Sequence, residues 1–287
     1  MNREVITSEL RNDISTHSYQ EPDILDPIIY IICQAMPVEK IFLLGIYPAN
    51  PSTLGIEYDL LVLFNALDKR PTHELESLIL NRCHDFAMIS VSVFNINKVN
   101  QMLREGNIFF SSICNSEKIL FDKDGLHLAN SSLCEQRPDF YKIEAEFSGL
   151  MSKASAFLRG AISYRKTNDF QLSAFMLHQT VEHTMNAFLC PLMGCRIQTH
   201  NLTKLLLYAR RFSIRFYEIF PRDTDKEVKL YQTLQKAYIY GRYKNNFQVE
   251  EETLLILVDR SVALIALAEF VFKEKIEILQ SGRTNIS

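Results

Sequence analysis

The sequence predicts an α+β fold in two parts, because the spacing of apolar residues changes near residue 140. Before this point, short apolar or alternating runs are separated by turn residues and helical patches, which is typical of a sheet with helices. After it, apolar residues recur every three or four positions, which predicts an all-α bundle. The 287 residues, 47% of them hydrophobic, are enough for two parts of ordinary size.

The first part is expected to span residues 22–125, after a polar arm over residues 1–21. Asp26-Pro27 predicts a helix that ends at Ala35, since proline is favoured at the first helical position. Short apolar runs predict the strands, which cover residues 41–47, 59–64, 87–95 and 118–122.

A linker is predicted over residues 126–140, which are rich in turn formers, and the helical part over residues 141–282. Short loops between its helices predict antiparallel, up-and-down packing of four or five helices. Two helices have clear apolar stripes, one over residues 169–190 and one over residues 251–279. The predicted stripes are Ala174, Leu177, Val181, Met185 and Phe188 in the first, and Leu254, Val258, Val262, Ile265, Ala268, Phe272, Ile276 and Leu279 in the second.

Two carboxylates, Glu57 and Asp59, stand two residues apart in a predicted strand. Side chains at this spacing project to the same face of a strand, so the two would lie together. Mg²⁺ prefers oxygen ligands and is usually held by one or two carboxylates plus substrate phosphates. Gly45 is predicted to end the preceding strand in a turn, where a bare backbone would let a phosphate approach. The pattern indicates a phosphate and metal site, and the alternative is an edge strand with solvated acids.

This order of strand, glycine turn, loop and acidic strand resembles the nucleotidyltransferase fold of the DNA polymerase β type. The resemblance implies a mixed sheet with helices. It also implies that Glu57 and Asp59 are the catalytic and metal-binding carboxylates, that Mg²⁺ is the cofactor, and that Gly45 contacts the nucleotide.

Two departures from the nucleotidyltransferase pattern indicate a degenerate site. Ile46 stands where the family has a serine that helps to hold the terminal phosphates. The family's third carboxylate belongs on a later strand, and the strand predicted at 87–95 offers only Ser90 and Ser92. Asp85, just before that strand, would substitute only if the register were shifted.

The second part resembles the HEPN family of helical domains, which bind nucleotides or cleave RNA. The resemblance rests on AFMLHQTVEHTMNAFL at 174–189, THNLTKLL at 199–206 and AYIYGRYKNNF at 237–247. Asn186 departs from the family's usual lysine. HEPN domains frequently occur beside minimal nucleotidyltransferases, so each resemblance supports the other. The residues at matching positions are Gln179, Glu182, His200, Arg242 and Tyr243.

The resemblance implies a nucleotide of the ATP or GTP class as the ligand. Arg242 and Lys244 would hold its phosphates, because a planar guanidinium suits bidentate phosphate contact. Tyr243 or His200 would border the base. His178, Gln179 and Glu182 complete the predicted site, since positions four apart share one helix face. In the alternative interpretation, four side chains satisfy one another in a buried polar network: His178, Glu182, His200 and Arg242.

RNA is the less favoured partner. Many HEPN ribonucleases use an arginine, four to six residues, then a histidine, but Arg196 and His200 are separated by three residues only. The formal net charge of -3 provides no overall basic field for a nucleic acid. A local signal remains in YARRFSIRFY at 208–217, where arginines alternate with aromatic residues.

On a helix, the arginines of this run are predicted to form a solvated face, while its phenylalanines point inward. The predicted outward residues are Arg210, Arg211 and Arg215, and the inward ones Phe212 and Phe216.

The chain is expected to be cytoplasmic, without a membrane span or signal peptide. Its N-terminus has no apolar segment after a basic start, and the most apolar stretch contains Asp259, Arg260 and Glu269. Six cysteines without a CxxC pair predict reduced, buried thiols.

Three functions fit the sequence. The favoured one is a nucleotide-binding, homodimeric HEPN protein with a degenerate transferase part, regulatory or toxin–antitoxin-like. The second is an active Mg²⁺-dependent nucleotidyltransferase that moves a nucleoside monophosphate to an acceptor. The third is an RNA-binding protein or ribonuclease.

Overall fold

The computed structural model describes residues 24–48, 55–65, 68–114, 116–123, 125–129, 138–194, 197, 199–243 and 247–281. For residues 241–243 it describes the backbone only. The predicted arm over residues 1–21 lies outside the described residues, as does Lys244.

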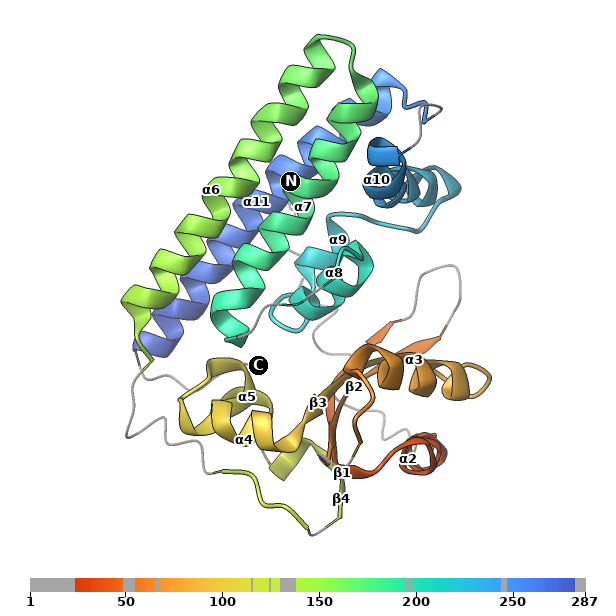
Figure 1. Ribbon diagram of the computed structural model, residues 1–287, viewed down its shortest axis with the longest axis vertical. Helices are drawn as coiled ribbons and strands as arrows, with labels where there is room; N and C mark the ends of the chain where they lie inside the picture. Colours follow the sequence, from red (N-terminus) through yellow and green to blue (C-terminus); the bar gives the residue numbers. More distant parts are fainter. Residues whose placement is uncertain are drawn as a thin grey trace, which may run out of the picture.

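The first part contains a four-stranded sheet with the strand order β3-β2-β1-β4 (Figure 1). Strand β1 runs antiparallel to both β2 and β4, whereas β2 and β3 are parallel. The sheet is therefore mixed, as the nucleotidyltransferase resemblance implied. Each strand overlaps a predicted run: β1 (Val38–Pro48), β2 (Ile56–Phe64), β3 (Met88–Asn95) and β4 (Ile119–Asp122).

Successive side chains of β2 point to opposite faces of the sheet, and both faces are buried. Leu60 and Val62 pack with the helices α2 and α3, whereas Leu61 and Leu63 belong to a buried cluster that contains α4, α5 and the helical second part. Two faces buried in this way explain why residues 58–64 of β2 are all buried. The helical elements of this part are α2 (Leu25–Ala35), α3 (Thr72–Cys83), α4 (Ile96–Arg104), α5 (Ile108–Ile113) and the short 3₁₀ turn η1 (Ser116–Lys118).

The second part is a helical bundle in which the long helices α6, α7 and α11 lie side by side (Figure 1). Helix α10 packs on α7, and α8 lies between the bundle and the sheet. The chain is α+β overall, as predicted. The helices are α6 (Phe140–Lys166), α7 (Phe170–Met193), α8 (Leu202–Arg210), α9 (Arg215–Glu218), α10 (Asp225–Tyr243) and α11 (Glu251–Gln280).

The predicted stripe of α7 is confirmed, because all five of its residues are fully buried. The stripe predicted for α11 is partly wrong. Val262 is 48% exposed, whereas Leu257 and Leu264, outside the predicted stripe, are buried. Apolar residues occupy most positions between Leu254 and Phe272 of this helix, so periodicity alone did not distinguish its inner face from its outer face.

One hydrophobic core joins the two parts. Leu61 and Leu63 of β2 belong to the same buried cluster as the inner residues of α7 and α11. Phe109 of α5 packs against Phe212 at a centroid distance of 5.8 Å, and Phe212 packs against Phe188 of α7 at 5.3 Å. The sheet and the bundle therefore share one core where they meet. Among the described helices, none is long and apolar enough to span a membrane.

Candidate functional site

The two carboxylates of the predicted metal site are paired with two arginines at the end of α8. Nη1 and Nη2 of Arg210 donate to the Glu57 carboxylate at 2.9 and 3.1 Å. Nε and Nη2 of Arg211 donate to the Asp59 carboxylate, both at 2.7 Å. Both pairs are bidentate, which is the strongest geometry available to an arginine and a carboxylate.

These pairs are buried between the sheet and the bundle. Asp59 is 0% exposed and Arg210 only 3%. The prediction that Arg210 and Arg211 form a solvated face is therefore wrong, because the end of α8 meets the acidic face of the sheet. Burial alone would lower the pKa of Arg211, but the charge of Asp59 and its hydrogen bonds raise that pKa above its ordinary value. Arg211 consequently stays charged.

The strand expected to carry a third carboxylate supplies hydroxyls instead. Parallel pairing of β2 and β3 places Ser90 opposite Asp59. Nη2 of Arg210 donates to Ser90 Oγ at 3.3 Å, and Nη2 of Arg211 donates to Ser92 Oγ at 2.9 Å. Within the described ranges, no group of three His, Cys, Asp or Glu side chains is placed to hold a metal ion.

Gly45 does not end its strand in a turn, contrary to the prediction. Strand β1 continues to Pro48, and an irregularity in register lies between Leu43 and Gly45. A Cβ at Gly45 would meet the Tyr47 ring at 2.8 Å, so this ring lies directly over the bare backbone. The guanidinium of Arg210 lies in turn 3.8 Å from the centroid of that ring. The position expected to admit a phosphate is therefore covered by the protein's own side chains.

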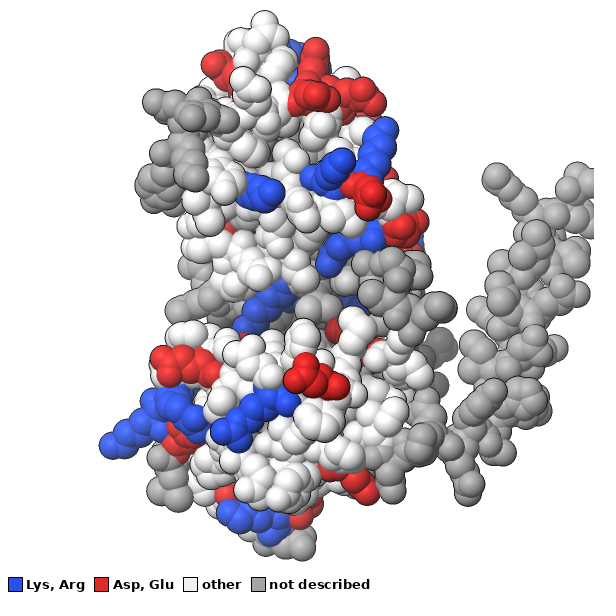
Figure 2. All heavy atoms as spheres, turned by 90° about the vertical axis from the view of Figure 1, so that its right-hand side faces the viewer, with Lys and Arg blue, Asp and Glu red and all other residues white. Residues whose placement is uncertain are grey.

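A third ion pair connects α8 with the sheet part. Lys204 Nζ bonds to the Glu76 carboxylate, and Glu76 is itself buried on α3. Lys204 and the two arginines thus meet three acids of the first part. Elsewhere, on the face in Figure 2, Lys and Arg side chains lie among Asp and Glu side chains and form no continuous basic patch. That face therefore offers no continuous basic surface for the backbone of a nucleic acid.

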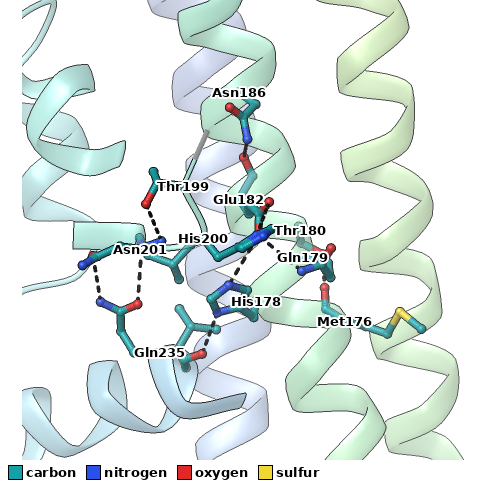
Figure 3. A network of polar contacts seen from close by, with 12 residues as sticks. Met176, His178, Gln179, Thr180, Glu182, Asn186, Thr199, His200, Asn201 and Gln235 are labelled. Atoms are coloured by element: carbon teal, nitrogen blue, oxygen red, sulfur yellow. Dashed lines mark hydrogen bonds and ion pairs between the residues drawn. The ribbon is translucent and has the colours of Figure 1, made fainter. Parts of the chain in front are cut away.

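A second polar cluster lies in the bundle, centred on Glu182 of α7. His200 Nδ1 is 3.0 Å from both carboxylate oxygens of Glu182, and His178 Nε2 is 3.5 Å from Oε2. Gln179 Nε2 donates to Oε2 at 3.3 Å. Figure 3 shows both imidazole rings pointing toward this carboxylate. The structure thus brings together four of the residues predicted for the nucleotide site.

His178 is the buried member of this cluster. Its Nδ1 lies 3.0 Å from the backbone oxygen of Leu234 on α10, while its Nε2 faces the Glu182 carboxylate. Both neighbours are hydrogen-bond acceptors. The contact with the Leu234 backbone connects α7 to α10 at this point.

His200 is the exposed member, with 58% of its side chain accessible. Its ring stacks on Tyr238 of α10 at a centroid distance of 4.3 Å and an angle of 19°. The exposed His200 ring is therefore held between the Glu182 carboxylate and the half-buried Tyr238 ring. Arg242 follows Tyr238 by one helical turn of α10, but the side chains of Arg242 and Tyr243 lie outside the described residues, as does all of Lys244.

The loop that carries His200 is held by Gln235, which the sequence did not single out. Gln235 Nε2 donates to Asn201 Oδ1 at 3.4 Å (Figure 3) and to Thr203 Oγ1 at 2.9 Å. Its Oε1 accepts from the Leu202 backbone N–H at 3.3 Å. Gln235 and Tyr238 are three residues apart on α10 and so share one face. This shared helix face was the only feature of the sequence that could have connected Gln235 and Tyr238 with the site.

Glu182 is predicted to make the stability of the protein depend on pH in the acid range. Burial by itself would raise its pKa, but His178 and His200 hold that pKa below its ordinary value of 4.5. The resulting stabilisation is fully present above pH 4.5 and is lost as the pH falls through the lowered pKa. The Glu182→Gln variant should therefore lose less stability than the wild type on acidification below pH 4.5, measured by urea unfolding. The exposed Glu274→Gln variant should keep the wild-type profile, and an unchanged profile for Glu182→Gln would contradict the prediction.

Comparison with known proteins supports the helical resemblance. Residues 147–273, which extend from within α6 into α11, match the family model of the HEPN domain. The sheet part has the mixed topology described above but no match to a nucleotidyltransferase family. No curated protein is similar enough to the chain to count as a match.

Proposed function

We propose that this HEPN-domain protein binds a nucleotide of the ATP or GTP class through its helical part. The sheet part of the same chain packs against the helices and is not catalytic. One observation carries the proposal: Arg210 and Arg211 already neutralise the two carboxylates that Mg²⁺ would need. A divalent ion would have to displace two buried bidentate pairs. In the docked arrangement, nucleotide binding therefore falls to the helices.

The stacked pair of His200 and Tyr238 is the proposed contact for the base. A flat, exposed ring fixed by a buried carboxylate loses little conformational freedom when a ligand stacks on it. Arg242, one turn farther along α10, is the proposed phosphate ligand because a guanidinium offers two parallel donors. A regulatory or toxin–antitoxin-like role, and assembly as a homodimer, follow from the family resemblance alone and belong to the same proposal.

A thermal-shift panel of ATP, GTP, CTP and UTP, each with and without Mg²⁺, tests this function. A ligand present at 100 times its Kd stabilises the folded state by about 2.7 kcal/mol, which raises the melting temperature measurably. We expect a nucleotide shift that is independent of Mg²⁺, lost in Arg242→Ala and weakened in His200→Ala. The matched control is Arg165→Ala, which removes an arginine of α6 that pairs with Glu251 of α11 and should preserve the shift.

Two results would favour the other functions. Mg²⁺-dependent release of pyrophosphate, abolished by Asp59→Ala, would identify an active nucleotidyltransferase. Metal-independent cleavage of single-stranded RNA, weakened by Arg242→Ala, would identify a ribonuclease. Absence of any nucleotide shift would contradict the proposed function.

A further inference from the structure

The nine-residue helix α8 has one polar cluster at each end. His200 stands two residues before its first residue, and Arg210 is its last residue, followed directly by Arg211. Its inner residues Leu202 and Leu206 are fully buried in the core that joins the two parts. A short, tightly packed helix of this kind moves as one body, because its two ends are connected by continuous backbone hydrogen bonds.

The N-terminal end of α8 is attached to α10. Asn201 caps the helix by accepting from the Lys204 backbone N–H at 3.2 Å, and Gln235 donates to both Asn201 and Thr203. Thr203 Oγ1 lies 3.0 Å from the hydroxyl of Tyr231, also on α10. His200 directly precedes Asn201, so its backbone is connected to this attached end of α8.

The C-terminal end is attached to the sheet and, through stacked side chains, back to α10. Arg210 stacks on Tyr47 at 3.8 Å and lies 5.4 Å from the Tyr217 ring centroid. The guanidinium of Arg222 lies between Tyr217 at 4.6 Å and Tyr231 at 4.2 Å. This alternating series of tyrosines and arginines starts at β1 and ends at the tyrosine that contacts Thr203. Both ends of α8 thus belong to one connected set of contacts.

We propose that α8 couples the docking of the sheet part to the geometry of the His200 site. The ion pairs of Arg210 with Glu57 and of Arg211 with Asp59, here called the docking pairs, fix the position of α8. In this position the helix holds His200 between Glu182 and Tyr238. Loss of the docking pairs shifts α8 and displaces His200. As far as it concerns a ligand, the inference rests on the proposed function, and coupling must then be reciprocal: a nucleotide bound at His200 strengthens the docking.

The coupling can be measured without any nucleotide. The Cε1–H resonance of His200 would be followed by NMR in protein with ¹³C-labelled histidine, and assigned by its absence in His200→Gln. The test variant is Glu57→Gln/Arg210→Gln, which removes both charges of one docking pair and so leaves no buried charge unpaired. The matched control is Glu227→Gln/Arg260→Gln, which removes an ion pair between α10 and α11.

We expect the His200 resonance to shift in the test variant and to stay in place in the control. Arg211→Lys, which keeps the charge but loses the bidentate geometry, should shift it in the same direction. An unchanged resonance in both docking variants would overturn the coupling, as would an equal shift in the control.

The outcomes also separate this inference from the proposed function. If His200 responds to the docking variants but no nucleotide raises the melting temperature of the wild type, the coupling stands and the nucleotide proposal fails. If a nucleotide binds to the wild type while the His200 resonance is unchanged in the docking variants, the coupling fails and the function stands.

Discussion

Replacement of Asp59 by asparagine is expected to lower the free energy of unfolding by about 3–5 kcal/mol, because it leaves the charge of Arg211 buried without its counter-charge. The loss should be this large because the Asp59 side chain is 1% exposed and that of Arg211 6%, so water replaces little of the lost interaction. Urea unfolding followed by far-UV circular dichroism measures the change.

Two further variants make this result specific. The double variant Asp59→Leu/Arg211→Met removes both charges and should recover much of the lost stability, since apolar side chains of similar volume often replace a buried ion pair well. Glu252→Gln breaks an exposed pair with Lys226 and should change the stability by at most about 1 kcal/mol. A near-neutral Asp59→Asn would mean that the arginines are solvated in solution and that the acidic face is open.

The second large effect is expected at the core that joins the two parts. Phe109→Ala should cost about 3–5 kcal/mol, because it removes a fully packed ring from the contact between α5 and the bundle. Since sheet and helices share this core, the variant should lower one common unfolding transition. Far-UV dichroism at increasing urea would follow the helices, and near-UV dichroism would follow the tyrosines of both parts.

The control for this prediction is Phe86→Ala, in the first part but 65% exposed, which should have little effect. If Phe109→Ala instead split the unfolding curve into two steps, with only one of them displaced, the two parts would be independent domains. In that case the docking pairs would be the main connection between them.

Much of the local structure could be predicted from residue spacing. The inner face of α7 was correctly predicted from its apolar stripe. The face of α11 was assigned partly wrongly, because apolar residues occupy most of its positions between Leu254 and Phe272. The shared face of Glu57 and Asp59 follows from strand geometry, and that of His178 and Glu182 from helix geometry. Gly45 was misread, because a glycine at a strand irregularity has the same sequence signal as one in a turn.

Residue spacing predicted the four strands, the helix that ends at Ala35, the two long helices with apolar stripes, and the side chains that share a face, and the motifs of the second part indicated its resemblance to the HEPN family. Only the tertiary structure decided that Arg210 meets Glu57 and that Arg211 meets Asp59, since these partners are 153 and 152 residues apart. An arginine at the end of a helix is solvated or buried according to the surface that packs against it, and local periodicity carries no information about that surface. The acidic pair was therefore visible in the sequence as a metal site, and the folded chain supplies it with two guanidinium groups.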